Sequence, residues 1–513
     1  MKGEPLLTSR STREQVSSEI SDGLRPTSYM EYILSSSRNW PTIALLVYFG
    51  LRLLFFAINI SPQVPPDEVT HFGKCEIFSK VFLLPGNTPE SYQYGLVTNS
   101  PWVYYWLMGK LLALNFLGIP DLVFLRLLNI PFAFGTIYFV RRMLRLLTDD
   151  RLTEILLVVL MTNTMMFSFL SASVSYDNLT NLLAAMALYY LFAFFKERSA
   201  TMLATSILCQ LAGCLTKITF LPLVLIMGIV LAIHELRNFH LLPSALKAWV
   251  HSSGKRGLGL TLAVVLGLVL NIQLYGGNYI RYRVVEPEAY DVLPLENAMQ
   301  YRLAARNYIF NLFKEGRITA GQANEMAAKI NHPGDRSDTI NLVKHYAQMQ
   351  QDGAKPVGFL FYTALWARNM LESTFGIKAH LGVANSGLSF IPLALLILLA
   401  GFAFLVRWRP WENSWLPSLL AAVALSYGFF ILYKVNYPAY LEYNDFVMTV
   451  AGRYLFPVLG PIYVLFSYYL LRLFRGRNAR FVISVVAVIT FIACDFPFFL
   501  SNVTPDWFTF SLQ

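Results

Sequence analysis

Long apolar stretches that recur along the whole chain constrain its fold more than any other feature. About eleven of them approach the roughly 20 residues that an α-helix needs to cross a bilayer. With 55% hydrophobic and only 14% charged residues among 513, the sequence predicts an all-α polytopic membrane protein. Lys217 separates the fifth stretch from the sixth, which predicts either a tight hairpin or two broken half-helices there. The stretches lie near residues 41–60, 122–145, 152–172, 179–195, 201–215, 217–234, 258–275, 387–406, 415–433, 454–472 and 481–500.

The positions of the basic residues predict the orientation of these spans. If the N-terminus is cytoplasmic, the cytoplasmic loops hold most of the Lys and Arg residues between spans, and the short outer loops hold almost none. This bias explains most of the formal net charge of +10. The positive charge therefore does not indicate nucleic-acid binding.

The polar parts of the chain predict its domain organisation. Residues 1–38 lack the apolar core of a signal peptide and are expected to form a flexible cytoplasmic tail. Residues 39–500 are expected to form one transmembrane domain, with two large outer-face segments at 61–121 and 276–386. Residues 501–513 are expected to be a short tail on the outer face.

Two amphipathic stretches within the outer-face segments are expected to lie along the membrane interface rather than to cross the bilayer. The first, 99–116, is rich in Trp and Tyr, which favour the headgroup zone. The second is 359–382. Counting 99–116 as a span would reverse the charge bias of the loops that follow it.

Residues with useful chemistry gather on the side that this orientation places outside the cell. Directly after the first span, prolines hold the backbone extended ahead of Asp67, Glu68 and His71. Charged groups at a membrane edge cost desolvation free energy, so they usually serve chemistry, ion binding or a polar network. The other candidates on this side are Asp177, Lys217, Glu442, Asp445, Arg453 and Tyr454.

Carboxylates and cations on one face suit a reaction in which an acceptor is deprotonated while a phosphate leaves. No GxxxxGK[ST] or GxGxxG pattern occurs in a predicted cytoplasmic loop, which argues against a nucleotide-driven cytoplasmic site. Free nucleotides are scarce outside the cell. An activated donor used there is therefore expected to be linked to a lipid.

Four short motifs, in order along the chain, resemble the polytopic GT-C glycosyltransferases. The resemblance is closest to a bacterial branch usually described only as membrane proteins of unknown function, and it covers about residues 40–475. The phrase STFG at 373–376 is also similar to that branch. The four motifs are PDE-x-x-H at 66–71, an aspartate at Asp177, a lysine and a proline at Lys217 and Pro222, and GRY-x-x-P at 452–457.

This resemblance implies a hexosyl- or pentosyltransferase of the bacterial inner membrane. It would take a sugar from a polyprenyl-phosphate carrier, such as undecaprenyl phosphate, and pass it to a glycan, lipid, wall polymer or protein on the outer face. A single inverting displacement is the family expectation. The sequence leaves open which sugar is moved, which acceptor receives it and whether a divalent cation is needed.

The resemblance also implies roles for individual residues. Asp67 would be the catalytic base, and Glu68 would position the acceptor or a divalent cation. Asp177 would be a second acidic contact to the acceptor or a metal, with His71 beside Asp67 in the substrate site. The lipid phosphate would be held by Lys217 and Arg453, next to Tyr454.

Each candidate also has a structural interpretation. The acidic pair after the first span would cap the following helix, and Asp177 would cap the fourth span. His71 would be a structural hydrogen-bonding group. Lys217 would extend toward the membrane interface, and Arg453 would pair with Glu442 or Asp445.

Other functions also stay open: a lipid or glycan transporter or flippase, and a polysaccharide polymerase or ligase. Transporters tend to have internal repeats and charges near the midplane, whereas this sequence has no evident repeat and its charges cluster at one edge. The polymerases and ligases rely on Arg-rich outer loops rather than on an Asp–Glu pair in the first loop. A purely structural subunit would not need acids and cations on one face.

Overall fold

The computed structural model describes residues 40–235, 254–330, 333–353, 356–378, 382–384, 390–409, 415–446 and 449–509. In these ranges the regular structure is helical, apart from an isolated antiparallel bridge between Ile60 and Phe508. The predicted all-α class is confirmed. The chain divides into residues 1–47 and 48–513, and the contacts described below lie within the second unit. The tail expected at 1–38 lies outside the described residues.

Within the described ranges, seven helical stretches are long and apolar enough to cross a membrane, and a bent pair, α7 (Arg151–Thr162) with α8 (Met165–Ser171), would be an eighth. The seven are α3 (Trp40–Asn59), α6 (Asp121–Arg145), α9 (Tyr176–Glu197), α13 to α14 (Gly254–Tyr282), α22 to α23 (Trp415–Tyr443), η6 to α24 (Gly452–Leu473) and α25 to α26 (Arg477–Asn502). Their parts are α13 (Gly254–Asn271), η3 (Ile272–Gly276), α14 (Gly277–Tyr282), α22 (Trp415–Phe430), η5 (Ile431–Asn436), α23 (Tyr437–Tyr443), η6 (Gly452–Val458), α24 (Leu459–Leu473), α25 (Arg477–Ala493) and α26 (Phe496–Asn502).

The remaining predicted spans correspond to shorter apolar helices. They are α10 (Ala200–Cys214), α11 (Phe220–Glu235) and α21 (Ile391–Arg407), with 15, 16 and 17 residues. A span needs roughly 20 residues, so the predicted count of about eleven spans is not confirmed. Between α10 and α11, Lys217 lies in a turn, as both interpretations of that segment require.

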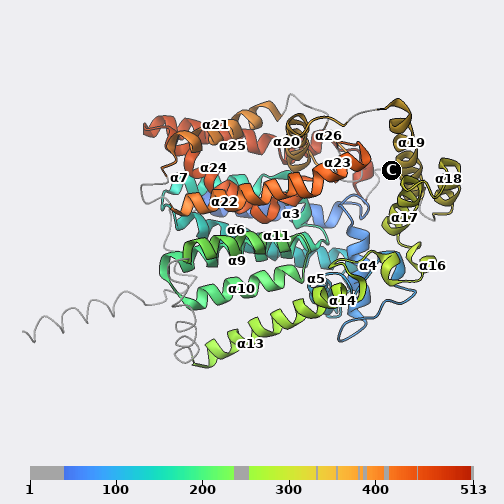
Figure 1. Cartoon of the computed structure of the whole chain (residues 1–513). Helices are drawn as coiled ribbons and strands as arrows, with labels where there is room; N and C mark the ends of the chain where they lie inside the picture. The colour runs from blue at the N-terminus through green and yellow to red at the C-terminus, as the bar shows by residue number, and fades with distance from the viewer. Residues whose placement is uncertain are drawn as a thin grey trace, which may run out of the picture. The chain divides into compact units, whose positions relative to one another are not determined.

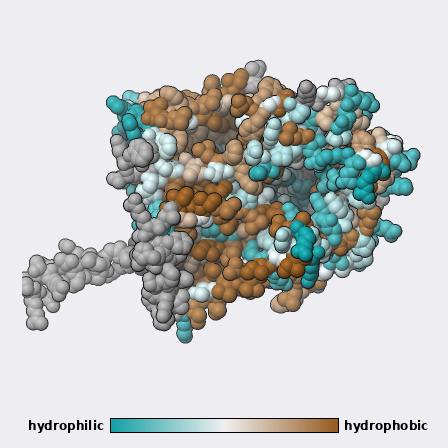
Figure 2. All heavy atoms as spheres, viewed as in Figure 1, coloured by the Kyte–Doolittle hydropathy of each residue, from teal (hydrophilic) through white to brown (hydrophobic). Residues whose placement is uncertain are grey.

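The spanning helices differ in how far they are enclosed by protein. In α9, 83% of its most apolar 18-residue stretch is buried, and α9 packs against α6 and α10 (Figure 1). In the stretch that contains α13, only 17% is buried, and Leu258, Leu262 and Leu266 are exposed. Figure 2 shows hydrophobic side chains over α13, α10 and α22, which is the surface that a membrane protein presents to lipid.

Three short elements follow α3: α4 (Glu68–Ser79), η1 (Tyr92–Tyr94) and α5 (Val103–Leu112). With ten residues, α5 is too short to cross a bilayer, which agrees with the interpretation of 99–116 as a non-spanning stretch. Its side chains do not all face a membrane surface, however. Tyr104 and Tyr105 are buried in a core that α5 shares with α4 and α6.

The segment after α14 is also helical. It contains α15 (Ala289–Val292), α16 (Leu295–Ala298), α17 (Arg302–Lys314), α18 (Ala320–Ala328), α19 (Pro333–Asp352) and α20 (Phe359–Phe375). Helices α17, α18 and α19, here named the three-helix cluster, have a small core of their own that includes Ile309, Ala323 and Val343. The cluster lies beyond one end of the spanning helices (Figure 1), and hydrophilic side chains gather over it (Figure 2).

The chain breaks between α7 (Arg151–Thr162) and α8 (Met165–Ser171), ahead of α9. The helix axis bends by 65° between them. The carbonyl of Thr162, freed by the break, accepts hydrogen bonds from Arg52 and from Ser168, at 3.2 Å in the second case. The Thr164 and Tyr463 hydroxyls lie 2.6 Å apart. Protein groups thus satisfy the broken helix, as an apolar environment requires.

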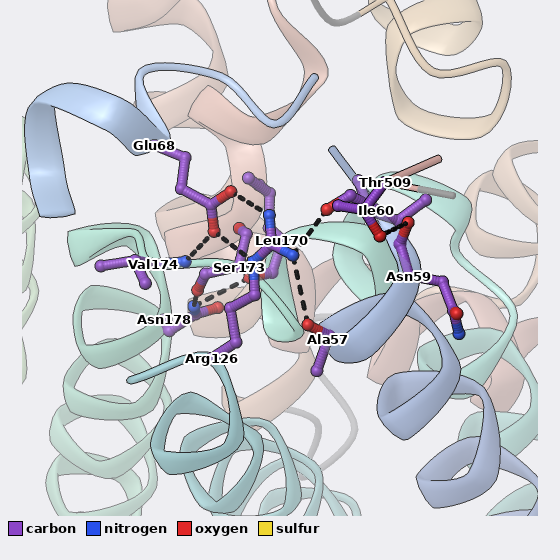
Figure 3. Close-up of polar contacts among 10 residues, drawn as sticks. All are labelled: Ala57, Asn59, Ile60, Glu68, Arg126, Leu170, Ser173, Val174, Asn178 and Thr509. Carbon is purple, nitrogen blue, oxygen red and sulfur yellow. Dashed lines mark hydrogen bonds and ion pairs between the residues drawn. The ribbon is translucent and has the colours of Figure 1, made fainter. Parts of the chain in front are cut away.

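The last described residues, up to Thr509, pack against the end of α3 and the loop that follows it. After η7 (Pro505–Trp507), the Thr509 amide donates to the Asn59 carbonyl at 2.8 Å (Figure 3), and the Ser61 amide donates to the Trp507 carbonyl at 2.9 Å. The Trp507 side chain is buried against Phe169 and other aromatic rings. The described part of the expected tail 501–513 is therefore a docked segment that supports the first loop.

Candidate active site

Asp67 occupies the position just before α4, with a left-handed backbone conformation (φ 57°, ψ 14°) that Asp tolerates better than most residues. Its carboxylate does not cap the helix. Instead, Oδ1 accepts a hydrogen bond from Arg302 at 3.0 Å, and Oδ2 accepts one from Arg453 at 3.1 Å. The Asp67 side chain is 32% exposed. The capping interpretation of Asp67 is therefore wrong, and its carboxylate is a partly accessible partner of two arginines.

Glu68, the next residue, points into the protein (Figure 3). Both of its oxygens accept from Arg126 of α6, and Oε1 also accepts from the Val174 amide at 2.7 Å. Arg126 in turn donates to the carbonyls of Ile60 and Ala57 at the end of α3, at 2.7 and 3.2 Å. Neither side chain is accessible to solvent. Glu68 therefore ties together α3, α4, α6 and the turn before α9.

The turn before α9 is fixed by a neighbouring amide. The side chain of Asn178 donates to the carbonyls of Leu170 and Ser173 at 2.8 and 3.0 Å (Figure 3). The N-cap of α9 is Ser175, whose hydroxyl accepts from the Asp177 amide at 3.2 Å. The interpretation of Asp177 as the helix cap is wrong, because its carboxylate is left for another partner.

That partner is Lys217, which forms a buried ion pair with Asp177. The Lys217 ammonium lies 4.7 Å from the centre of the Tyr176 ring and 5.4 Å from that of Tyr454. Both rings favour a cation at this range. Lys217 is thus buried and paired with a carboxylate, which argues against the interpretation of an exposed side chain at the membrane interface.

His71 lies between these two ion pairs. Its Nδ1 is 2.8 Å from the Tyr105 hydroxyl, and its ring meets that of Tyr176 edge to face at 4.4 Å. Burial lowers the pKa of His71 to about 3, against the opposing pull of Asp67 and Asp177. At neutral pH the imidazole is therefore uncharged and fills the space beside Asp67 as a polar, hydrogen-bonded ring.

Arg453 is positioned by the motif that contains it. The Gly452 amide donates to the Ser373 hydroxyl at 2.8 Å, so the GRY and STFG motifs lie against each other. A Cβ at position 452 would overlap the Thr374 side chain, so only glycine fits. The pairing of Arg453 with Glu442 is wrong: Glu442 binds Lys314 at 2.8 Å. Among the described residues, no group hydrogen-bonds to the buried Nε of Arg453.

The charges around Asp67 decide its protonation state. Burial alone would raise the pKa of Asp67, but Arg453 and Arg302 favour the carboxylate and hold the pKa below its usual range. Because the pKa is low, Asp67 is ionised at neutral pH. The site thus has a carboxylate that can accept a proton and two neighbouring cations that can bind an anion.

The acidic residues that the sequence offered as possible metal ligands mostly have other partners. No group of three or more His, Cys, Asp and Glu residues within the described ranges is placed to hold a metal ion. The oxygens of Glu68 are taken by Arg126 and Val174, and Asp177 is paired with Lys217. The hard-cation site considered from the sequence is not formed by these residues.

The sequence motifs did not point to two arginines at the site, Arg126 and Arg302. Arg126 lies in an apolar span, where a charged residue usually marks a buried pair, and this signal was available. Arg302 had no such signal, because it is one of several basic residues in an amphipathic segment. The structure brings Asp67, His71, Asp177, Lys217 and Arg453 together, and it directs Glu68 away from them.

No protein-family model and no curated protein matches the chain. Among solved structures, ArnT from Cupriavidus metallidurans in the apo state is 15% identical, with 85% of this chain and 78% of that chain covered and a TM-score of 0.35. For the same protein bound to undecaprenyl phosphate the values are 16%, 86%, 79% and 0.35. The Archaeoglobus fulgidus oligosaccharyltransferase, tethered to an acceptor peptide, is 13% identical, with 89% of this chain and 55% of that chain covered and a TM-score of 0.43.

Proposed function

We propose that the chain is an integral-membrane glycosyltransferase that moves a hexose or pentose from a polyprenyl-phosphate carrier to a glycan, lipid, wall polymer or protein. One observation carries the proposal: a partly exposed carboxylate, Asp67, lies against Arg453 in a cluster that also contains the Asp177–Lys217 pair. This cluster lies at one end of a bundle of apolar helices. It combines a proton acceptor with cations suited to phosphate.

Asp67 acts as the base in this proposal. The acceptor hydroxyl gives its proton to Asp67 while its oxygen forms a bond to the anomeric carbon of the sugar. The bond from that carbon to the phosphate oxygen breaks, and its electron pair leaves with the lipid phosphate. Support comes from the partial exposure of the carboxylate and from its ionised state at neutral pH.

Arg453 and Lys217 bind the phosphate and stabilise the charge that develops on it. The buried Nε of Arg453, which makes no hydrogen bond to a described residue, supports this role, because a buried donor without an acceptor is costly. A guanidinium also matches the geometry of phosphate oxygens. The ring of Tyr454 faces Lys217 and helps to keep it in place.

The remaining candidates serve the site in different ways. Glu68 positions the first loop through Arg126 and makes no contact with substrate in this proposal. His71 and Asp177 line the site beside Asp67 and Lys217. The position of the basic loops supports an N-terminus in the cytoplasm and a site on the outer face of the bacterial inner membrane.

The test is transfer of radiolabelled sugar from synthetic polyprenyl-phosphate hexoses and pentoses to a membrane extract, with the purified protein in detergent. We expect Asp67→Asn to lose transfer by roughly 10²- to 10⁴-fold, the usual contribution of a general base. Asp149→Asn, an equivalent change at an exposed site outside the cluster, should keep full activity. Parallel reactions with EDTA report whether a divalent cation takes part.

The outcome separates the proposal from its alternatives. If a folded wild-type protein transfers no sugar from any donor, the proposal is refuted. Movement of the lipid-linked sugar across vesicle membranes without transfer would then identify a flippase. Transfer from lipid-diphosphate glycans alone would identify a polymerase or ligase.

A further inference from the structure

Asp67 is held by two arginines that differ in how firmly they are placed. Arg453 belongs to η6, its side chain is 13% exposed, and the adjacent Gly452 is locked against Ser373. Arg302 is the first residue of α17 in the three-helix cluster, and its side chain is 32% exposed. Arg453 is thus a fixed partner of Asp67, while Arg302 is the partner nearer to solvent.

Arg302 also has a second carboxylate within reach. Its Nη1 lies 3.5 Å from Oδ1 of Asp335, in the first turn of α19, while its Nη2 bonds to Asp67. One guanidinium therefore bridges the site and the three-helix cluster. If Arg302 releases Asp67, the Asp335 carboxylate still balances its charge, so release costs less than for an arginine with a single partner.

The two arginines occupy different oxygens of Asp67. Arg302 takes Oδ1, and Arg453 takes Oδ2. A general base must present an oxygen to the hydroxyl that it deprotonates, within hydrogen-bond distance. With both arginines bound, each oxygen of Asp67 already accepts a hydrogen bond from a cation, which lowers its basicity and leaves less space for an acceptor hydroxyl.

We propose that Arg302 is a latch on the base: Asp67 Oδ1 is the oxygen that accepts the proton, and Arg302 must move from it to Asp335 before an acceptor hydroxyl can bind there. This inference rests on the proposed glycosyl transfer and adds its regulation. While Arg302 stays on Oδ1, a water molecule beside the bound donor cannot give its proton to that oxygen. Arg302 is therefore a positioning residue that favours transfer over hydrolysis of the donor.

Several groups besides Arg302 surround Asp67 and set its charge state. They are Arg453 from η6, His71 from the same α4 region, Tyr301 from the start of α17, and Tyr176 at the start of α9. Asp177 and Lys217 balance each other in the next pair. Replacing Arg302 by a neutral residue removes one positive charge and leaves the others in place, so the change in Asp67 can be assigned to Arg302.

The first test uses Arg302→Gln, and its first readout does not depend on turnover. A carbodiimide labels protonated carboxyl groups, so labelling of Asp67 as a function of pH, read by mass spectrometry, gives its titration midpoint. We expect the midpoint to rise by about one pH unit, the lower end of the effect of a close opposite charge, since the pair is partly exposed. Arg317→Gln, in an exposed pair with Glu315, is the matched control and should leave the midpoint unchanged.

The second readout is the fate of the donor. Arg302→Gln should move the acid limb of the transfer rate upward by the same amount, and it should raise hydrolysis of the donor relative to transfer when acceptor is scarce. Asp335→Asn should instead favour the contact between Arg302 and Asp67. Without its second anchor Arg302 stays on Asp67, so kcat falls while the KM for the donor changes little.

Specific results would overturn the latch. If Arg302→Gln raises the KM for the donor with an unchanged labelling midpoint, Arg302 binds the donor phosphate and does not guard the base. If the variant only unfolds more easily, with the same midpoint and the same ratio of hydrolysis to transfer, Arg302 is structural. A shifted midpoint in a protein whose wild type transfers no sugar would instead refute the proposed function.

Discussion

The most decisive stability experiment concerns Glu68, which the sequence places next to Asp67 and the structure places in a different environment. Glu68 and Arg126 are both inaccessible to solvent and share two hydrogen bonds. Glu68→Gln keeps the size of the side chain but removes its charge, so Arg126 becomes a buried cation without a counter-ion. Breaking a buried pair from one side costs about 3–5 kcal/mol. That is a large part of a total stability of about 5–15 kcal/mol.

The measurement is thermal unfolding in detergent, followed by the fluorescence of the protein's nine Trp residues. Glu68→Gln should lower the unfolding midpoint strongly. The control is Glu315→Gln, which breaks the exposed pair with Arg317 and should cost no more than about 1 kcal/mol. Adding Arg126→Met to Glu68→Gln should recover part of the loss, because the uncompensated charge is gone. Recovery should be incomplete, since the carbonyls of Ala57 and Ile60 then lose their donor.

The transfer assay separates a supporting role from a chemical one. If Glu68 acts through Arg126, transfer by Glu68→Gln should fall in proportion to the loss of folded protein. A variant as stable as the wild type that nevertheless transfers no sugar would refute the supporting role. In that case Glu68 would have to contact a substrate, as the resemblance implies.

Three further predictions follow from single contacts. The transfer rate should persist as the pH falls to about 4, the ordinary pKa of a carboxyl group, because the pKa of Asp67 is depressed below that value. An acid limb near pH 6 in a kcat/KM profile would contradict this. Gly452→Ala should cost about 1–3 kcal/mol by overpacking against Thr374 and should also lower transfer, whereas wild-type unfolding and activity would show that the space exists. Trp507→Ala should cost about 3–5 kcal/mol in unfolding experiments, unlike Trp408→Ala at an exposed site, and equal effects of the two changes would argue against docking of the chain end.

The helical class could be predicted because an apolar stretch of the right length has few other stable forms in a bilayer. The number of spans could not be, because α10, α11 and α21 have the composition of a span without its length. Hydropathy measures composition over a window, whereas the length of a helix depends on where its hydrogen bonds end. At Lys217 the sequence predicts an interruption. It does not predict the distant contact at that turn, where the Tyr427 hydroxyl donates to the Thr219 carbonyl.

The composition of the site was partly predictable, but its contacts were not. The motifs placed Asp67 and Arg453 on the same side of the membrane, yet 386 residues separate them, and no periodicity reports that they form an ion pair. The structural alternatives failed for a related reason. Local rules offered Asp177 as a helix cap, but Ser175 takes that place and leaves the Asp177 carboxylate for Lys217. A carboxylate that could cap a helix locally instead pairs with a distant cation when the charged hydrogen bond is the stronger contact.

The neighbouring acids Asp67 and Glu68 diverge because of the backbone between them. Asp67 has a left-handed conformation, and Glu68 begins α4 as a regular helical residue, so their side chains leave the chain in different directions. One reaches the partly exposed cluster with Arg453 and Arg302, and the other reaches the enclosed guanidinium of Arg126. The enclosed pair holds the loop rigid, and rigid support is what keeps a catalytic group in productive geometry. It follows that the order of the two acids matters more than their number: exchanging them would keep the charge of the loop but would put a shorter carboxylate against Arg126 and a longer one against Arg453.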